Sequence, residues 1–163
     1  MGTMVYDGTK MKKIRRAAFV VRSATAGDVD AMWALERSVA REKVLWGEIP
    51  TTRKAIASRI GPLAFVAESN GRHVGHVYGV ARKPGPYCVF RKGERYMEVD
   101  AAYIRCGWRS RGVGSLLLRR LLQAAKREGF RRFLVYTANK DLERAIRFYR
   151  RAGFKTWCAN LFI

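Results

Sequence analysis

Apolar and polar residues alternate along the chain with two periods, one typical of strands and one typical of helices. Residues 17–22 (AAFVVR) predict a strand, and residues 29–39 predict a helix that begins after cap residues within 25–28. The apolar side of this helix consists of Val29, Met32, Trp33 and Leu35. A loop containing Trp46 then leads to a shorter helix, for which Thr51 or Thr52 is the expected cap.

The middle of the chain predicts a β-hairpin and a further strand. The runs 63–68 (LAFVAE) and 73–81 (HVGHVYGVA) flank Asn70-Gly71, a dipeptide that two-residue hairpin turns favour because both positions need positive φ. The next strand is expected over 95–104, after a segment punctuated by Pro and Gly. His73 and His76 lie three positions apart on a strand, so we expect them on opposite faces and assign them no role. No metal site is expected.

The second half predicts two amphipathic helices, each followed by a strand. The first helix, over 113–128, has apolar residues at helical spacing and ends at Gly129. Residues 132–138 (RFLVYTA) predict a buried strand, 140–152 a helix and 154–162 a last strand. This order of elements indicates an α/β fold with a mixed sheet.

Length and composition indicate one soluble domain. The 163 residues fit a single domain, expected over 14–163, with 1–13 as a flexible tail. No apolar run reaches the length of a membrane span and no signal-peptide stretch precedes Arg15, so we expect a cytoplasmic protein without membrane contact. The three cysteines form no CxxC pair, which indicates reduced thiols rather than disulfides or zinc ligands.

The formal net charge of +20 is unusual for a chain of this length. The segment from Arg105 to Lys155 holds fifteen basic and three acidic residues. A surface of this sign attracts phosphates and repels polycations. Two interpretations stay open: a solvated arginine-rich surface, or a patch that binds nucleic acid.

The segment from Tyr103 to Leu122 predicts an anion site. A strand runs through a short basic loop directly into a helix, and the first amides of a helix lack partners within it. Gly112 and Gly114 leave room for a phosphate to approach the backbone, while Arg109 and Arg111 supply positive charge. The loop lacks the Lys-Ser/Thr of a Walker motif and the third glycine of a dinucleotide fingerprint. Alternatively, the glycines only ease the turn from strand to helix.

Arg109-x-x-Gly112-x-Gly114 resembles the signature of the GNAT superfamily of N-acetyltransferases, whose loop holds the pyrophosphate of coenzyme A. Segments 21–35, 67–77 and 138–154 are similar to that family's first strand and helix, its second hairpin and its last helix. The resemblance implies a mixed, mostly antiparallel central sheet flanked by about four helices. It also implies acetyl-CoA as the acyl donor.

The resemblance assigns cofactor contacts to two segments. Residues of the loop would hold the pyrophosphate: Arg109, Ser110, Arg111, Gly112, Val113, Gly114 and Ser115. The end of the preceding strand would pair with the pantetheine arm, whose amides need partners: Ala102, Tyr103 and Ile104. Many members also have an asparagine seven residues before their tyrosine, where this chain has Leu142. Asn139 is the candidate replacement, with helix capping as its alternative role.

Two residues are candidates for the proton transfers of the reaction. Tyr149 matches the family's tyrosine near the coenzyme A sulfur, and a phenol with a pKa of about 10 can donate a proton to a leaving thiolate. Its alternative role is that of a core aromatic. The attacking amine must lose a proton. Glu98 is the candidate base, because it stands fourteen positions before Gly112, a spacing that matches the catalytic glutamate of some family members, whereas other members use only water. Asp100 lies two residues on and is expected on the same sheet face, where the pair of acids would hold a proton-carrying water or bind a cationic acceptor. Alternatively, both acids only balance nearby arginines.

The resemblance leaves the acceptor open. Trp46 falls where the family's acceptor site is usually gated, although ordinary packing also accounts for it. Few residues follow Phe154, so the acceptor pocket is either more open than usual or completed by a second copy in a homodimer. The sequence therefore predicts an N-acetyltransferase that uses acetyl-CoA and a small-molecule or peptide amine. The alternative is a basic nucleic-acid-binding protein, or an acyltransferase acting on RNA or aminoacyl-RNA, on the same fold.

Overall fold

The computed structural model describes residues 18–47 and 51–158. The predicted tail over 1–13 lies outside these residues, as does the end of the predicted last strand. In the described part, the chain forms β1 (Val20–Ser23), α1 (Val29–Arg41), α2 (Arg53–Ala57), β2 (Ala64–Ser69), β3 (Arg72–Arg82), β4 (Tyr96–Ile104), α3 (Val113–Arg127), β5 (Phe133–Val135) and α4 (Leu142–Arg151).

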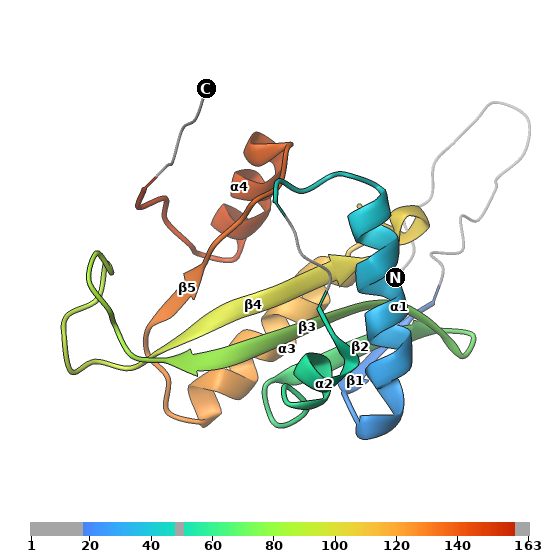
Figure 1. Cartoon of the computed structure of the whole chain (residues 1–163), viewed down its shortest axis with the longest axis horizontal. Helices are drawn as coiled ribbons and strands as arrows, with labels where there is room; N and C mark the ends of the chain where they lie inside the picture. Colours follow the sequence, from blue (N-terminus) through green and yellow to red (C-terminus); the bar gives the residue numbers. More distant parts are fainter. Residues whose placement is uncertain (1–17, 48–50, 159–163) are drawn as a thin grey trace, which may run out of the picture.

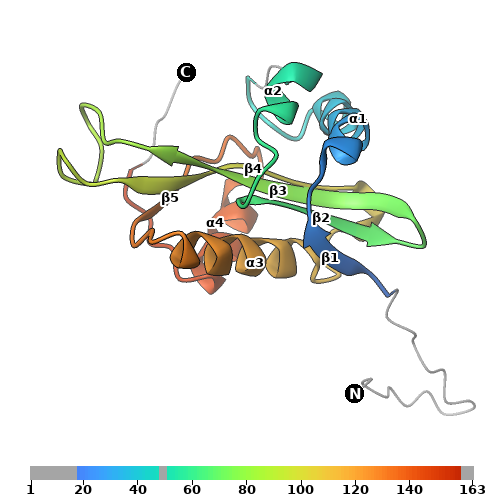
Figure 2. The same ribbon diagram turned by 90° about the horizontal axis from the view of Figure 1, so that it is seen from below.

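The strands form one mixed sheet in the order β1-β2-β3-β4-β5 (Figure 1). Neighbours from β1 to β4 are antiparallel, and β4 and β5 are parallel. Helices α1 and α2 cover one face of the sheet, and α3 and α4 lie on the other (Figure 2). This arrangement confirms the predicted α/β fold with a mostly antiparallel mixed sheet.

The helices form where the apolar periodicity predicts them. Met32 and Leu35 of α1 are buried against the sheet. On α3 the predicted apolar positions, four residues apart, are all buried: Val113, Leu117, Leu121 and Ala125. Thr52 caps α2 by accepting from the Ala55 amide. Gly129 has a φ of 83°, and its left-handed conformation ends α3 as predicted.

The sheet separates two apolar cores. The larger lies beneath α3 and includes Val77, Met97 and Val99. The smaller lies beneath α1 and α2 and includes Met32, Ile56 and Tyr78. Because α3 runs across the central strands, its first turn is held at the end of β4 (Figure 1).

The hairpin at Asn70-Gly71 is confirmed, with φ values of 48° and 71°. The expectation for its two histidines is wrong. Glu68 pairs with His73 but Ala67 pairs with Gly75, so Val74 is an extra residue in β3. This bulge shifts the alternation by one position and places His73 and His76 on the same face.

Two further predictions about the C-terminal part are wrong. Residues 154–158, the described part of the predicted last strand, form no strand, and β5 is only three residues long. Asn139 does not cap α4. The cap is Asp141, whose carboxylate accepts from the Arg144 amide at 3.1 Å.

Candidate active site

The turn between β4 and α3 exposes backbone amides. Ser110 and Gly112 have φ values of 61° and 88°, and Gly112 is the residue from which α3 starts. The amide of Leu116 is the first to bond back, to the Gly112 carbonyl at 3.0 Å. By helix geometry, the amides of 113–115 have no partner inside α3 and point out of its positive end.

Gly112 and Gly114 differ in conformation and in surroundings. A Cβ added at Gly112 would meet nothing within 4 Å, so this side of the turn is open to a ligand. A Cβ at Gly114 would lie 3.4 Å from the ring of Phe148, which packs on the first turn of α3. Gly112 therefore supplies the left-handed φ and access, whereas a Cβ at Gly114 would make only an ordinary van der Waals contact with Phe148.

One arginine at the turn is bound by other protein groups, whereas others are exposed to a ligand. Arg109 Nη2 lies 2.6 Å from Glu42 Oε2, and its Nε donates to the Ile104 carbonyl at 3.1 Å. Arg109 thus ties the turn to the end of α1. Arg111 is exposed and lies 5.5 Å from the Trp108 ring. Arg144 of α4 donates to Ser110 Oγ at 2.8 Å.

Arg144 lies on α4 but contacts the turn, and sequence spacing within the loop cannot predict this contact. It lies thirty-four positions from Ser110 and reaches the turn only because α4 packs beside α3. It places a second exposed cation, besides Arg111, at the open amides.

The strands β4 and β5 separate beside this turn. Their parallel pairing covers Met97, Glu98 and Val99, and β4 continues beyond it to Ile104 along β3. Ala102 is exposed, and Tyr103 and Ile104 are half-buried. The predicted pantetheine segment therefore lies where β4 has β3 on one side and has parted from β5 on the other.

A short strap crosses from α1 to the start of α4. Leu45 and Asn139 form an antiparallel bridge, the Trp46 amide donates to the Ala138 carbonyl at 2.8 Å, and the Lys140 amide donates to the Val44 carbonyl at 2.9 Å. The Trp46 ring is half exposed, with Lys140 Nζ 4.6 Å from its centroid. Asn139 uses its side-chain oxygen for the Asp141 amide at 2.9 Å.

Glu98 and Asp100 gather around one arginine. Arg82 Nε lies 3.7 Å from Glu98 Oε2, and Arg82 Nη2 lies 3.4 Å from Asp100 Oδ1. Arg59 of the segment after α2 lies 3.2 Å from the other oxygen of Asp100. Tyr78 pairs with Ala101 and Gly79 with Val99, so Asp100 is the extra residue of a bulge in β4. The structure thus brings the two acids together, each with a basic partner.

Tyr149 lies on the other side of the sheet, between two aromatic rings. Its ring centroid is 5.0 Å from that of Phe148 and 5.7 Å from that of Phe154, both edge-on. Burial raises the pKa of Tyr149 to about 12. The phenol therefore stays protonated throughout the physiological range, as a proton donor must be.

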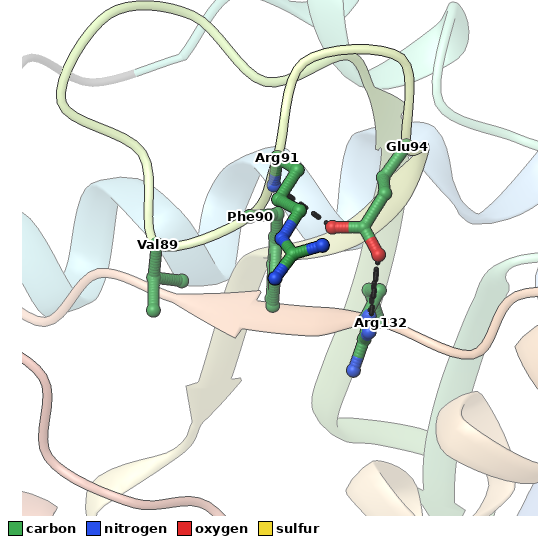
Figure 3. A pocket seen from close by; sticks show the side chains of 5 residues that line it. All are labelled: Val89, Phe90, Arg91, Glu94 and Arg132. Atoms are coloured by element: carbon green, nitrogen blue, oxygen red, sulfur yellow. Dashed lines mark hydrogen bonds and ion pairs between the residues drawn. The ribbon is translucent and has the colours of Figure 1, made fainter.

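A pocket of about 430 Å³ lies away from this region, under the loop between β3 and β4 (Figure 3). Its rim is held by Glu94, which accepts from the Arg91 amide at 2.8 Å and from Arg132 at 3.1 Å. These bonds lower the pKa of Glu94 and fix the loop on the start of β5. The pocket contains none of the predicted site residues.

The described residues contain neither a cluster of metal ligands nor a membrane-spanning helix. Over 18–47 and 51–158, no three His, Cys, Asp or Glu side chains gather as a metal site would require. No helix in the same ranges is long and apolar enough to cross a membrane.

Solved structures with this fold include several acetyltransferases. AAC(6')-Iy in complex with the bisubstrate analogue CoA-S-monomethyl-acetylneamine has a TM-score of 0.68 at 15% identity, over 90% of this chain and 97% of that one. A predicted acetyltransferase from Clostridium acetobutylicum with acetyl-CoA has a TM-score of 0.68 at 17% identity, over 90% and 96%. A putative acetyltransferase from Agrobacterium tumefaciens has 0.64 at 20%, over 88% and 98%.

These likenesses show a shared fold, and a sequence match shows the family. No curated protein matches the sequence. The model of the acetyltransferase (GNAT) family, however, matches residues 30–154, which run from α1 to just beyond α4 and include the strands β2 to β5. The chain therefore belongs to the GNAT family of acetyltransferases.

Proposed function

We propose that this protein transfers the acetyl group of acetyl-CoA to a primary amine, which attacks the thioester directly. The observation that carries the proposal is the open first turn of α3. This turn combines free amides with the left-handed Gly112 and the exposed Arg111 and Arg144. It lies beside the part of β4 that no longer pairs with β5. This combination fits a diphosphate joined to an extended chain that carries amides.

The residues present suit each part of coenzyme A. Ser110 to Ser115 would bind the pyrophosphate, with Arg144 added to the predicted set. Ala102, Tyr103 and Ile104 would bond the pantetheine arm as a neighbouring strand does. Arg109 would act indirectly, because Glu42 and the Ile104 carbonyl already bind its side chain. When bound, the cofactor supplies an activated acetyl group. We keep Asn139 as a candidate contact through its amide nitrogen.

The chain's own groups would handle the protons. Glu98 is the proposed base for the amine, and Asp100 would attract a cationic acceptor into the region between β4 and the α1–α2 side. Tyr149 would donate to the leaving thiolate, since its raised pKa keeps the phenol protonated. Trp46, half exposed on the strap, would border the acceptor.

The acceptor class follows from the charges. Glu98 and Asp100 would favour a cationic amine if it displaced Arg82 or Arg59 from them, whereas the net charge of +20 disfavours a large polycationic protein. One structural neighbour was solved with an aminoglycoside-derived bisubstrate analogue, which supports small polyamines as first candidates. A peptide amine is the second choice.

A direct experiment combines cofactor binding with an amine screen. Acetyl-CoA should raise the melting temperature, and the protein should release free thiol from acetyl-CoA with at least one of sisomicin, spermidine and tyramine. No melting shift, together with no thiol release from any amine, would contradict the proposal.

A second candidate function rests on the exposed surface of α3 and α4. The exposed cations there include Arg119, Arg120, Lys126, Arg127, Arg147 and Arg151. Glu143 pairs with only one of them, Arg147, at 3.2 Å. This surface would bind a phosphate backbone, alone or as part of an RNA-linked acceptor.

A further inference from the structure

The last turn of α1 leads directly into the strap that reaches α4. Lys43 has a φ of 52°, and its amide donates to the Ala40 carbonyl at 3.1 Å, so the helix ends just before this residue. The strap, residues 44–46, then runs from the end of α1 to the segment before α4 (Figure 1). Glu42, the last residue before the left-handed Lys43, therefore lies at the base of the strap.

Glu42 is the contact between this end of α1 and the turn between β4 and α3. Its Oε2 lies 2.6 Å from Arg109 Nη2, and Arg109 Nε donates to the carbonyl of Ile104, the last residue of β4, at 3.1 Å. The Glu42 and Arg109 side chains are only 25% and 27% exposed. Water and salt therefore screen this ion pair less than a pair on the open surface. Through Arg109, the base of the strap is tied to the end of β4.

The tip of the strap is tied to the chain beyond β5. Leu45 forms an antiparallel bridge with Asn139. The Trp46 amide donates to the Ala138 carbonyl at 2.8 Å. Because β5 ends at Val135, these partners belong to the segment that continues from it. The strap thus joins the end of β4 to the continuation of β5, across the place where the two strands part.

Helix α4 closes these contacts into a ring. Asp141 caps α4 by accepting from the Arg144 amide at 3.1 Å, and Arg144 Nη2 donates to Ser110 Oγ at 2.8 Å. Ser110 follows Arg109 directly, so α1 holds the turn through one residue and α4 holds it through the next. A displacement of the turn would therefore disturb the strap as well.

We infer that Glu42 is a positioning residue of the acetyl transfer, which joins the turn that binds coenzyme A to the strap that borders the amine. The inference rests on the proposed function. Glu42 acts through Arg109, because its carboxylate is paired with that guanidinium. Coenzyme A at the turn and an amine beside Trp46 favour the same arrangement of the ring, so each ligand strengthens the binding of the other.

The charge of Glu42 has a separate effect, which the experiment must keep apart from positioning. Replacing Glu42 by Gln leaves Arg109 unpaired and makes the turn more positive, which by itself favours an anionic cofactor. Loss of the ion pair loosens the ring, which by itself weakens the coupling between the two ligands. The coupling, rather than the affinity for coenzyme A alone, is therefore the quantity that reports positioning.

The test measures the Kd for coenzyme A with and without whichever of sisomicin, spermidine and tyramine supports thiol release. In the wild type, the amine should tighten coenzyme A binding by about fivefold or more. Glu42→Gln and Arg109→Gln break the same ion pair from opposite ends, and each should reduce this factor to below about twofold. The double variant should match the single variants, because all three lack the same contact.

Glu143→Gln is the matched control. It makes the same chemical change and breaks an ion pair of α4 with Arg147, at 3.2 Å, that lies outside the ring. This variant should keep the coupling of the wild type. Melting curves without ligand show whether each variant is folded, and Arg109→Gln tests the ion pair if Glu42→Gln is not.

Backbone amide resonances give a readout that needs no acetyl transfer. Coenzyme A should shift the amides of Leu45 and Trp46 in the wild type as well as those of 112–114, whereas in Glu42→Gln only the amides of 112–114 should move. Strap amides that respond equally in both proteins, or a Glu42→Gln variant with the coupling of the wild type, would overturn the inference.

The two proposals fail in different ways. If coenzyme A leaves the amides of 112–114 of the wild type unchanged, the proposed function fails and the inference fails with it. A response at 112–114 without any response at the strap refutes the inference alone.

Discussion

Gly112 is the residue on which the proposed cofactor binding depends most directly. Its φ of 88° and the open space beside it are both visible in the structure, and both follow from the absence of a Cβ. Gly129, at the other end of α3, has a similar φ of 83° and equally open surroundings. The two glycines thus form a matched pair that differs in position alone.

Gly112→Trp and Gly129→Trp should each lower stability, by about 1–2 kcal/mol, because a side chain is strained in the left-handed region. Only Gly112→Trp should lose the stabilisation by acetyl-CoA, which is about 2.7 kcal/mol at a hundredfold excess over Kd. Melting curves with and without acetyl-CoA measure both effects. An equal acetyl-CoA shift in the two variants would contradict the assignment of the turn.

Tyr149→Phe should lower kcat more than it raises the Kd for acetyl-CoA, because it removes a proton donor but keeps the ring packed between Phe148 and Phe154. The pKa of about 12 implies that the wild-type rate shows no decline due to Tyr149 below about pH 11. Steady-state kinetics of the wild type and the variant across pH measure both effects. Unchanged turnover in the variant would remove the proposed acid role.

At the scale of elements, periodicity and turn chemistry predict most of the fold. The apolar spacing gave the buried side of α3, and Asn70-Gly71 gave the hairpin. Apolar periodicity cannot, however, predict a β-bulge. The extra residues Val74 and Asp100 shift the alternation of β3 and β4, so His73 joins His76 on one face. Buried Glu36 escapes notice for a similar reason, because a charged residue on α1 looks solvent-facing until its partners are known.

The start of α1 offers a prediction about pH. Asp28 accepts from Arg22 at 2.7 Å and from the Thr25 amide at 2.7 Å, and these bonds hold its pKa well below the usual range. A lowered pKa stabilises the fold above the unfolded value of about 4, and the gain is lost as pH falls. Asp28→Asn should therefore cost about 1–2 kcal/mol at pH 7, and the difference should shrink below pH 4. Denaturant titrations at several pH values measure it; a difference independent of pH would contradict it.

At the scale of the whole molecule, the sheet separates the proposed acceptor region from the basic surface. Helices α1 and α2 lie on one side of the sheet, and α3 and α4 on the other (Figure 2). The α1–α2 side carries Glu98, Asp100 and a buried chain of hydrogen bonds from His73 to Tyr78, whereas the exposed residues of α3 and α4 are mostly basic. The candidate loop, the strand end and the family follow from the sequence. The contacts of Arg144 with Ser110, and of Glu42 with Arg109, do not, because they join segments far apart in the chain.

The basic side yields a prediction of its own. Replacing Arg119, Arg120 and Arg127 by Gln should weaken binding to a single-stranded RNA 20-mer and reduce the slope of log K against log salt by about 2. The charge-matched replacement of Arg41, Lys43 and Lys54 should change the slope less, since these exposed residues lie on α1, α2 and the loop between them. Fluorescence anisotropy at several salt concentrations measures both. Equal slopes would show that the charge of α3 is not a binding surface.

The most direct measurement of the central claim is an NMR titration of the ¹⁵N-labelled protein with coenzyme A. The account predicts saturable shifts of the amides of Gly112, Val113 and Gly114, with smaller shifts along 102–104 of β4 and none at Gly129. Saturable binding that leaves the amides of 112–114 unchanged, or no binding at all, would contradict it.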